Sequence, residues 1–223
     1  LLRKELQKKN WKVNPIMLSG NTDCYQPIEK KLEITRNILK VLLDFKHPIG
    51  VITKNSLIQR DIDILQEMAS LNLVNAVISI TTLDEEVRRK MEPRTASAKK
   101  RLQTVEMLAK AGIPIMVNIA PIIPGLNDTE IFSIAKAAAE HGALTINYNI
   151  VRLPGEVEPV FTHWLETSFP LKKEKILHQI ANAHGGEIQD NKSGRRMRGE
   201  GVLADSIKQQ MQLVFNTIRK MFT

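Results

Sequence analysis

Cysteine is almost absent from this chain of 223 residues, because Cys24 is its single example. One thiol excludes a disulfide framework within the chain, so a reducing cytosol is the expected compartment. No apolar run approaches the roughly 20 residues that a membrane-spanning helix needs, and no signal peptide is visible. The sequence therefore predicts a cytoplasmic protein without a membrane partner.

The common motifs of hydrolytic, nucleotide-binding and zinc sites are also missing. The patterns HExxH, Walker A, GxGxxG and GxSxG do not occur in the sequence. The five histidines have no spacing that is typical of metal ligands; they are His47, His141, His163, His178 and His184. Nucleophilic hydrolysis and a zinc site are therefore not expected.

Acidic residues are too few to balance the basic ones, which gives a formal net charge of +8 at pH 7. Residues 171–223 hold ten Lys/Arg against five Asp/Glu, a net of five positive charges. This balance permits nucleic-acid binding, but a solvated basic surface has the same composition. Candidates for phosphate or substrate contacts here are Arg195, Arg196 and Arg198. The alternative for these arginines is ion pairing with carboxylates such as Glu200.

Apolar, strand-like runs alternate with segments of helical periodicity, and 43% of the residues are hydrophobic, enough for one substantial core. The expected strands are nearly continuous apolar runs, which is typical of a parallel sheet covered by helices. Strands are expected at 15–19, 49–53, 74–80, 113–120 and 144–151. Helices are expected at 31–44, 57–69, 98–111, 127–141 (capped by Asn127 and Asp128), 171–183 and 203–221.

Two architectures fit this alternation, an open doubly wound sheet and a (β/α) barrel. The barrel is favoured because polar residues recur at the strand ends. The expected fold class is α/β, a partial (β/α)6 TIM-type barrel of parallel strands with a helical C-terminal extension. Residues 1–152 would form the barrel core and residues 153–223 the extension. The chain opens on LLRKELQKK, inside an amphipathic helical pattern. We therefore expect a fragment without the first strand.

Polar side chains follow each expected strand, at the edge where parallel β/α folds bind their ligands. They provide hydroxyls, amides, a carboxylate, an arginine and a lysine, and a buried lysine there favours an anionic ligand. These residues are Ser19, Asn21, Thr22, Asp23, Thr53, Lys54, Asn55, Ser79, Thr81, Thr82, Asn118, Asn147, Asn149 and Arg152. For any single residue, a helix cap or a loop hydrogen bond is an equal alternative; as a set, they predict a ligand site.

Seven short segments carry, by their order and spacing, a resemblance to a known family. They are LSGNTDCYQPIE, ITKN, ISITTLDEE, EPRTAS, KRL, APIIPGLND and RMRGEG. Over almost its whole length the chain resembles the radical S-adenosylmethionine (SAM) superfamily, and within it the group labelled DNA repair photolyase that is related to spore photoproduct lyase. The resemblance implies an enzyme whose [4Fe–4S] cluster cleaves SAM, after which the radical abstracts hydrogen from a substrate.

The resemblance also implies cofactors and partners. The CxxxCxxC cysteines that hold the cluster would lie upstream of Leu1, so no metal ligand is expected in this chain and the fragment alone would be inactive. Flavodoxin or ferredoxin would supply the electron, and DNA or RNA is a candidate substrate. Two rival functions stay open: a non-catalytic nucleic-acid-binding barrel, and a (β/α) barrel enzyme acting on a phosphorylated metabolite.

The resemblance assigns roles to particular residues in SAM binding. Lys54 matches a lysine that contacts the SAM carboxylate, and Ser79 matches a serine that contacts the ribose. Arg94 is placed to meet the SAM carboxylate or a carboxylate of the protein. The loop 120–125, which follows Asn118, matches the segment that approaches the adenine. The residues in place of the usual GGE motif, which meets the methionine amino group, are Ser19, Asn21, Thr22 and Asp23.

One position departs from the pattern of spore photoproduct lyase. Gly20 stands where that enzyme has its hydrogen-donating cysteine, so the thymine-dimer reaction itself is not predicted. Cys24 lies four residues later, and a buried, inert thiol is the expected state for it. The catalytic residues therefore stay unassigned.

Overall fold

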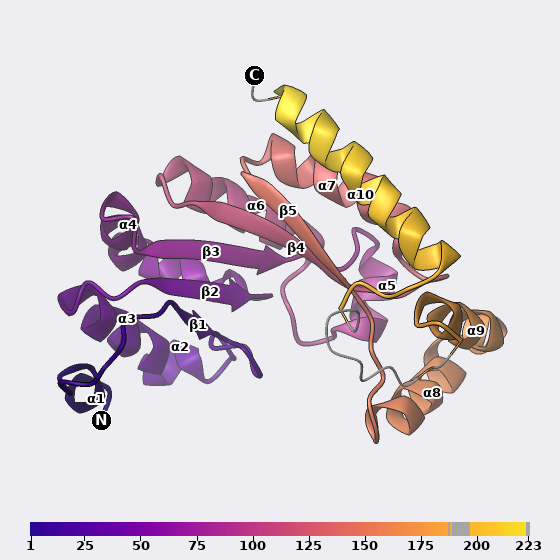
Figure 1. Ribbon diagram of the computed structural model, residues 1–223, viewed down its shortest axis with the longest axis horizontal. Helices are drawn as coiled ribbons and strands as arrows, with labels where there is room; N and C mark the ends of the chain where they lie inside the picture. Colours follow the sequence, from indigo (N-terminus) through magenta and orange to yellow (C-terminus); the bar gives the residue numbers. More distant parts are fainter. Residues whose placement is uncertain (187, 189–196, 222–223) are drawn as a thin grey trace. The chain divides into compact units, whose positions relative to one another are not determined.

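The computed structural model describes residues 1–186, 188 and 197–221, with side chains described as far as residue 217. Its five parallel strands form one sheet in the order β1-β2-β3-β4-β5 (Figure 1). The strands are β1 (Ile16–Leu18), β2 (Ile49–Thr53), β3 (Val74–Ser79), β4 (Ile115–Ile122) and β5 (Thr145–Ile150). The predicted α/β class and parallel sheet are confirmed.

Helices follow the strands in most of the expected places. They are α1 (Leu2–Leu6), α2 (Glu29–Leu32), α3 (Ile34–Asp44), α4 (Ile62–Ser70), α5 (Glu85–Met91), α6 (Ala98–Lys110), α7 (Ile131–Glu140), α8 (Val157–Ser168), α9 (Lys173–Ala183) and α10 (Val202–Met221). Short 3₁₀ turns precede three of them, at Ser56–Asp61, Asp128–Glu130 and Pro170–Lys172. The helix expected at 31–44 is interrupted because Glu33 has a left-handed backbone, with φ of 51°.

The chain divides into two compact units. The first contains Leu1–Ser79, Arg94–Val117 and Ala138–Thr145, and the second contains Ile80–Pro93, Asn118–Ala137 and Ile146–Thr223. These units cut across the boundary at residue 152 that the sequence suggested. The division into a barrel core and a C-terminal extension therefore stays a prediction.

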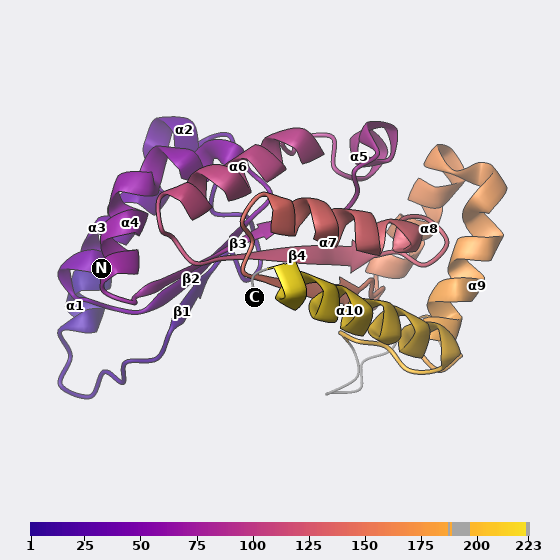
Figure 2. The ribbon, with the colours of Figure 1, turned by 90° about the horizontal axis from the view of Figure 1, so that it is seen from above.

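In the first unit, helices cover one face of β1, β2 and β3 (Figure 2). The strands are in parallel register, with Ile16 opposite Ile49 and Ile49 opposite Val74. The covering helices α3, α4 and α6 each contribute fully buried apolar side chains, among them Leu39, Leu65 and Leu108. Burial of each such side chain contributes roughly 1.5–3 kcal/mol, so the apolar faces of these helices hold the strands in place.

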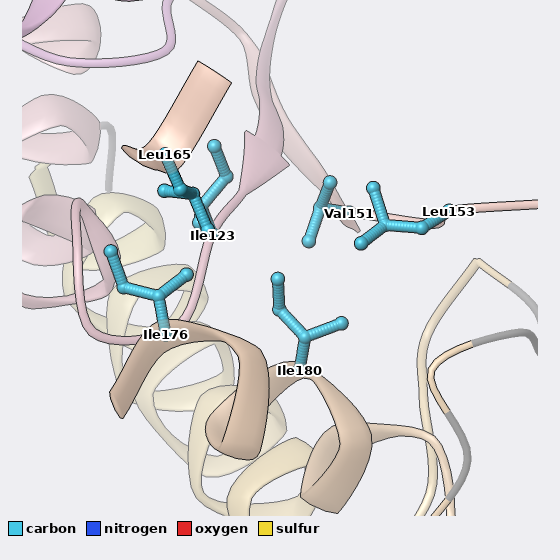
Figure 3. Close-up of a cluster of buried hydrophobic side chains, with 6 residues drawn as sticks. All are labelled: Ile123, Val151, Leu153, Leu165, Ile176 and Ile180. Atoms are coloured by element: carbon cyan, nitrogen blue, oxygen red, sulfur yellow. The ribbon is translucent and has the colours of Figure 1, made fainter. Parts of the chain in front are cut away.

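The second unit has its own apolar core, in which residues distant in sequence converge (Figure 3). The core joins the chain after β4 and β5 to helices α8 and α9. Its buried members are Ile123, Val151, Leu153, Leu165, Ile176 and Ile180. Helices α8 and α9 therefore share one core with the chain that follows the last two strands. Helix α10 has buried side chains of its own, those of Ala204, Ile207, Met211 and Val214.

Candidate functional site

The loop after β1 is fastened to the end of β2 by the carboxylate of Asp23. The Thr53 hydroxyl donates to both carboxylate oxygens, at 2.7 and 2.9 Å. The backbone N–H of Lys54 donates to Oδ2 at 2.8 Å, and the backbone N–H of Tyr25 donates to Oδ1 at 2.9 Å. Charge-assisted bonds of this kind are strong, and here they use most of the carboxylate's acceptor capacity. Asp23 therefore positions the loop and the start of the Lys54 segment.

The other predicted residues of the first unit differ in their exposure to solvent. Lys54 is half-buried, Ser79 is 6% exposed, and Asn21, Thr22 and Arg94 are exposed. Ser19 has a left-handed backbone with φ of 74°, and its hydroxyl accepts the N–H of Cys24 at 2.8 Å. The Ser19–Asp23 loop is thus shaped by its own side chains and leaves Asn21 and Thr22 facing solvent.

Asn55 makes a helix cap and a loop hydrogen bond, the alternative to ligand binding that was open for every strand-end residue. Its side-chain oxygen accepts the N–H of Leu57 at 3.0 Å, which caps the 3₁₀ turn, and its amide donates to the Tyr25 carbonyl at 2.7 Å. A helix cap of this type satisfies a backbone donor that the turn leaves unpaired. Asn55 therefore has a structural role in this region.

Behind the loop lies a buried ionic cluster that the sequence did not indicate. Asp61 is fully buried and accepts hydrogen bonds from the guanidinium groups of Arg36 and Arg60, each at 2.9 Å. The Tyr25 hydroxyl donates to the same carboxylate at 3.1 Å. Burial, followed by the charge of Asp61, raises the pKa of Tyr25, so its hydroxyl stays protonated. Through Tyr25, the cluster anchors the loop that contains Asp23.

The thiol of Cys24 is the remaining reactive group of this loop. It is partly buried, and its burial raises the thiol pKa above the ordinary value. A raised pKa leaves less of the nucleophilic thiolate at neutral pH. Partial burial and a raised pKa therefore favour the inert thiol expected from the sequence, which stays a prediction.

In the second unit, the two threonines after β3 are engaged by carboxylates. Thr81 donates to Glu92 at 2.7 Å, and Thr82 donates to Glu130 at 2.5 Å. Glu130 also accepts the backbone N–H of Leu83 at 2.7 Å. These hydroxyls hold the loop after β3 in place, so the structural alternative describes them better than ligand binding does.

The structure corrects the expectation for Asn127. The sequence predicted that its side chain caps the following helix, but the side chain makes no cap hydrogen bond. It is fully buried, accepts the N–H of Ile123 at 2.6 Å, and donates to the carbonyls of Thr81 and Pro121 at 2.8 and 3.0 Å. A buried loop backbone needs such partners, and an amide offers both donors and an acceptor. Asn127 joins the loops after β3 and β4.

Replacing Asn127 with alanine is expected to lower the free energy of unfolding by about 2 kcal/mol, because several buried backbone groups would lose their partner. The matched control is Thr129→Ala, two residues away and exposed, which should change stability by less than about 0.5 kcal/mol. Urea unfolding followed by circular dichroism measures both variants. Equal stability of the two variants would contradict the joining role.

Asn118 is a predicted site residue of the second unit and lies in β4. Its side chain is 6% exposed, and Oδ1 has no hydrogen-bond partner within the described part of the chain. Buried polar atoms are normally satisfied, so an orphaned one indicates a bound ligand or water. Asn118 therefore fits a ligand-contacting role.

The remaining predicted residues lie near β5. Asn149 and Arg152 are half-buried. Arg198 donates to the side-chain oxygen of Asn147 at 2.6 Å, so two separately predicted residues meet. The other candidate arginines, Arg195 and Arg196, lie outside the described residues.

No described residues form a metal site: no group of three or more His, Cys, Asp or Glu side chains is suitably placed in the described ranges. A cluster held by three thiolates does not fit a sequence with one cysteine. None of the described helices is both long and apolar enough to span a membrane.

The family model of the radical SAM superfamily matches residues 2–156. The chain belongs to the radical SAM superfamily. Among curated relatives, an uncharacterized protein of Mycobacterium tuberculosis is 28% identical over 172 residues, which are 76% of this chain and 51% of the relative. An uncharacterized protein of Methanocaldococcus jannaschii is 31% identical over 166 residues, 74% of this chain and 61% of the relative. The chain thus spans about half the length of the first of these relatives.

Solved structures of spore photoproduct lyase share the fold of this radical SAM chain. A relationship to this enzyme was expected from the sequence. One mutant aligns with a TM-score of 0.63 and 14% identity, over 97% of this chain and 62% of that one. Another, with bound AdoMet and dinucleoside spore photoproduct, aligns with a TM-score of 0.52 and 17% identity, over 76% of this chain and 49% of that one. The expected superfamily and its partial-barrel fold are confirmed.

Proposed function

We propose that the complete protein is a radical SAM enzyme that cleaves SAM and abstracts a hydrogen atom from its substrate. The observation that carries this proposal is the superfamily match, which covers residues 2–156 and so includes every strand of the sheet. When bound at a reduced cluster, SAM supplies the 5′-deoxyadenosyl radical. The cluster needs thiolates that this sequence does not supply, so the proposal concerns the complete protein.

Residues of the first unit suit the polar end of SAM. Lys54 offers a compact positive charge for the carboxylate, and Asp23 fixes its backbone. The carbonyls of the Ser19–Thr22 loop would accept from the amino group, because the Asp23 carboxylate is already engaged. Ser79, at the end of β3, would meet the ribose, and the exposed Arg94 would meet a carboxylate.

In the second unit, Asn118 offers an orphaned amide oxygen to SAM. A buried oxygen that has no partner among the described residues accepts a hydrogen bond at no cost in the contacts described. The adenine amino group and the ribose hydroxyls are the SAM donors that would fit it. Asn118 would thus bind and orient the nucleoside part of the cofactor.

Lys54→Ala is expected to weaken SAM binding about tenfold or more, because a charge-assisted bond to the carboxylate is lost. The hydrogen bond to Asp23 should survive the substitution, since it uses the backbone of residue 54. Isothermal titration of the reconstituted protein with SAM measures the affinity. The matched control, Lys40→Ala on the exposed side of α3, should bind SAM normally. Unchanged affinity with a sharply lower melting temperature would make Lys54 structural.

The activity itself is tested with the full-length protein, reconstituted anaerobically with iron and sulfide and then reduced with dithionite. Formation of 5′-deoxyadenosine from SAM is the expected result. A well-folded protein that binds no cluster and cleaves no SAM would overturn the proposal. In the cell, flavodoxin or ferredoxin in the cytoplasm would replace dithionite as the electron donor.

Nucleic acid is the proposed substrate class. The net charge of +8 suits a polyanion, and a solved structure that shares this fold holds a dinucleoside photoproduct. DNA and RNA should therefore be the first substrates added to the SAM cleavage assay. A rise in 5′-deoxyadenosine with either one is the expected result, whereas indifference to both would reject the class.

A further inference from the structure

A cavity of about 430 Å³ in the second unit is lined by residues of the last strand β5, of the segment before helix α10 and of α10 itself. Figure 1 shows the course of α10 and β5. This volume is within the range of roughly 300–1,000 Å³ that small-molecule sites occupy. The cavity is separate from the candidate SAM residues, none of which line it. Its lining combines aromatic, cationic and hydrogen-bonding side chains.

Arg198 is a cationic residue of the lining that makes two contacts with β5. Its guanidinium carbon lies 4.0 Å from the centroid of the Tyr148 ring, and one guanidinium nitrogen donates to Asn147 Oδ1 at 2.6 Å. Tyr148 is only 5% exposed, whereas Arg198 is exposed. Within the described residues, no carboxylate pairs with Arg198. The guanidinium is therefore held over the face of a buried ring, and its charge is available to a ligand.

The helix side of the cavity supplies the complementary groups. Lys208 is exposed and has no ion-pair partner in the part of the chain that the structure describes. Asp205 and Gln212 add a carboxylate and an amide, and Phe215 is an aromatic side chain that stays 43% exposed. Two cations against one carboxylate give the lining a net positive charge. The planar Arg198 guanidinium and the exposed Phe215 ring suit stacking on a base, and Lys208 suits the phosphate of the same nucleotide.

We propose that this cavity binds one unpaired nucleotide of a nucleic-acid strand. The base stacks on the outer face of the Arg198 guanidinium, as unpaired bases do on arginine planes. The phosphate meets Lys208, and Gln212 and Asp205 face the polar edge of the base. This inference rests on the proposed nucleic-acid substrate and locates a contact for it outside the SAM-binding residues.

The test is fluorescence anisotropy with a labelled single-stranded oligodeoxynucleotide and full-length protein purified without a cluster. Arg198→Ala is expected to weaken binding about tenfold, which is the usual loss for one stacked base. Arg198→Lys should recover only part of this loss, because it restores the charge and not the plane. The control Lys175→Ala removes an exposed lysine of α9 that does not line the cavity, and should weaken binding much less.

The salt dependence of oligonucleotide binding by the Lys208→Gln variant gives an independent test. Removal of one phosphate contact should lower the slope of log affinity against log salt by about 0.7 for a single strand. Thermal melting checks that each variant is folded. If Arg198→Ala proves unstable, Lys208→Gln alone decides. Variants that bind like Lys175→Ala, with an unchanged salt slope, would overturn the proposal.

Two further ligands identify the source of the nucleotide. Duplex DNA should bind more weakly than the single strand, because its bases are not free to stack on Arg198. Tight binding of a mononucleotide, without any gain from the strand, would assign the cavity to a free nucleotide and overturn the strand contact. Since neither SAM nor cluster is present, failure here leaves the SAM cleavage result unaffected, and the reverse also holds.

Discussion

Asp61→Ala should lower the free energy of unfolding by about 3 kcal/mol, a typical loss when one partner of a buried ion pair is removed. Asp61 is fully buried and forms ion pairs with two guanidinium groups, those of Arg36 and Arg60. The side chains of Arg36 and Arg60 are 19% and 20% exposed, so water relieves only part of the lost interaction. The buried Tyr25 hydroxyl also loses its acceptor.

Asp63→Ala is the matched control, because Asp63 pairs with the same Arg36 at 2.6 Å. The hydrogen bond from Arg36 lowers the pKa of Asp63 to about 2. Its side chain is nevertheless 61% exposed, and exposed ion pairs contribute only about 0–1 kcal/mol. Urea unfolding of both variants separates burial from ion pairing. Similar losses for the two variants would contradict the anchoring role of Asp61.

Apolar periodicity located the secondary structure well where an element faces a core. The expected strand at 49–53 matches β2 in both ends, and the helix expected at 98–111 matches α6 within one residue. These elements have continuous or periodic apolar residues, and their burial holds them in place. The same signal predicted a parallel sheet, which the structure confirms.

The helices that sequence analysis missed, α5 and α8, depend on tertiary contacts. Helix α5 consists mostly of charged residues and has no apolar period. The Trp164 indole in α8 donates to the Lys90 carbonyl at 3.0 Å, and the Lys90 ammonium lies 4.8 Å from the Phe169 ring centroid. Partners 74 or more residues apart leave no local pattern. Two local signals for α5 were available. The Asp84 side chain caps the helix by accepting from two backbone N–H groups, and the first turn is acidic while the last is basic.

The candidate site was predictable in its location but less so in the direction of its side chains. A strand end identifies which residues can face a ligand, but not whether a polar atom already has a protein partner. Asp23 and Thr82 turned out to be engaged within the protein, whereas the Asn118 oxygen has no described partner. The burial of Asp61 was not predictable from the sequence, because this residue lies within the helix expected at 57–69, where an acidic residue usually faces water.

Asp23→Ala is the change expected to disturb SAM binding most, with an affinity loss of about 100-fold. The carboxylate accepts from the 2%-exposed Thr53 hydroxyl and from two backbone N–H groups, so its removal leaves those donors unpaired. The free energy of unfolding should fall by about 2 kcal/mol as well. Because Asp23 fixes the backbone of Lys54, its loss also displaces the lysine that we assign to the SAM carboxylate.

Asp23→Asn separates positioning from direct contact with SAM. The amide keeps one oxygen for Thr53 and Tyr25 but presents an N–H to the Lys54 N–H, so stability and SAM affinity should fall together. The exposed neighbour Asn21→Ala should leave stability unchanged. Titration with SAM and urea unfolding of the same preparations give both quantities. If Asp23→Asn lost SAM affinity at full stability, Asp23 would be a direct ligand of the SAM amino group, and its contacts to Thr53 and Lys54 would be secondary to that role.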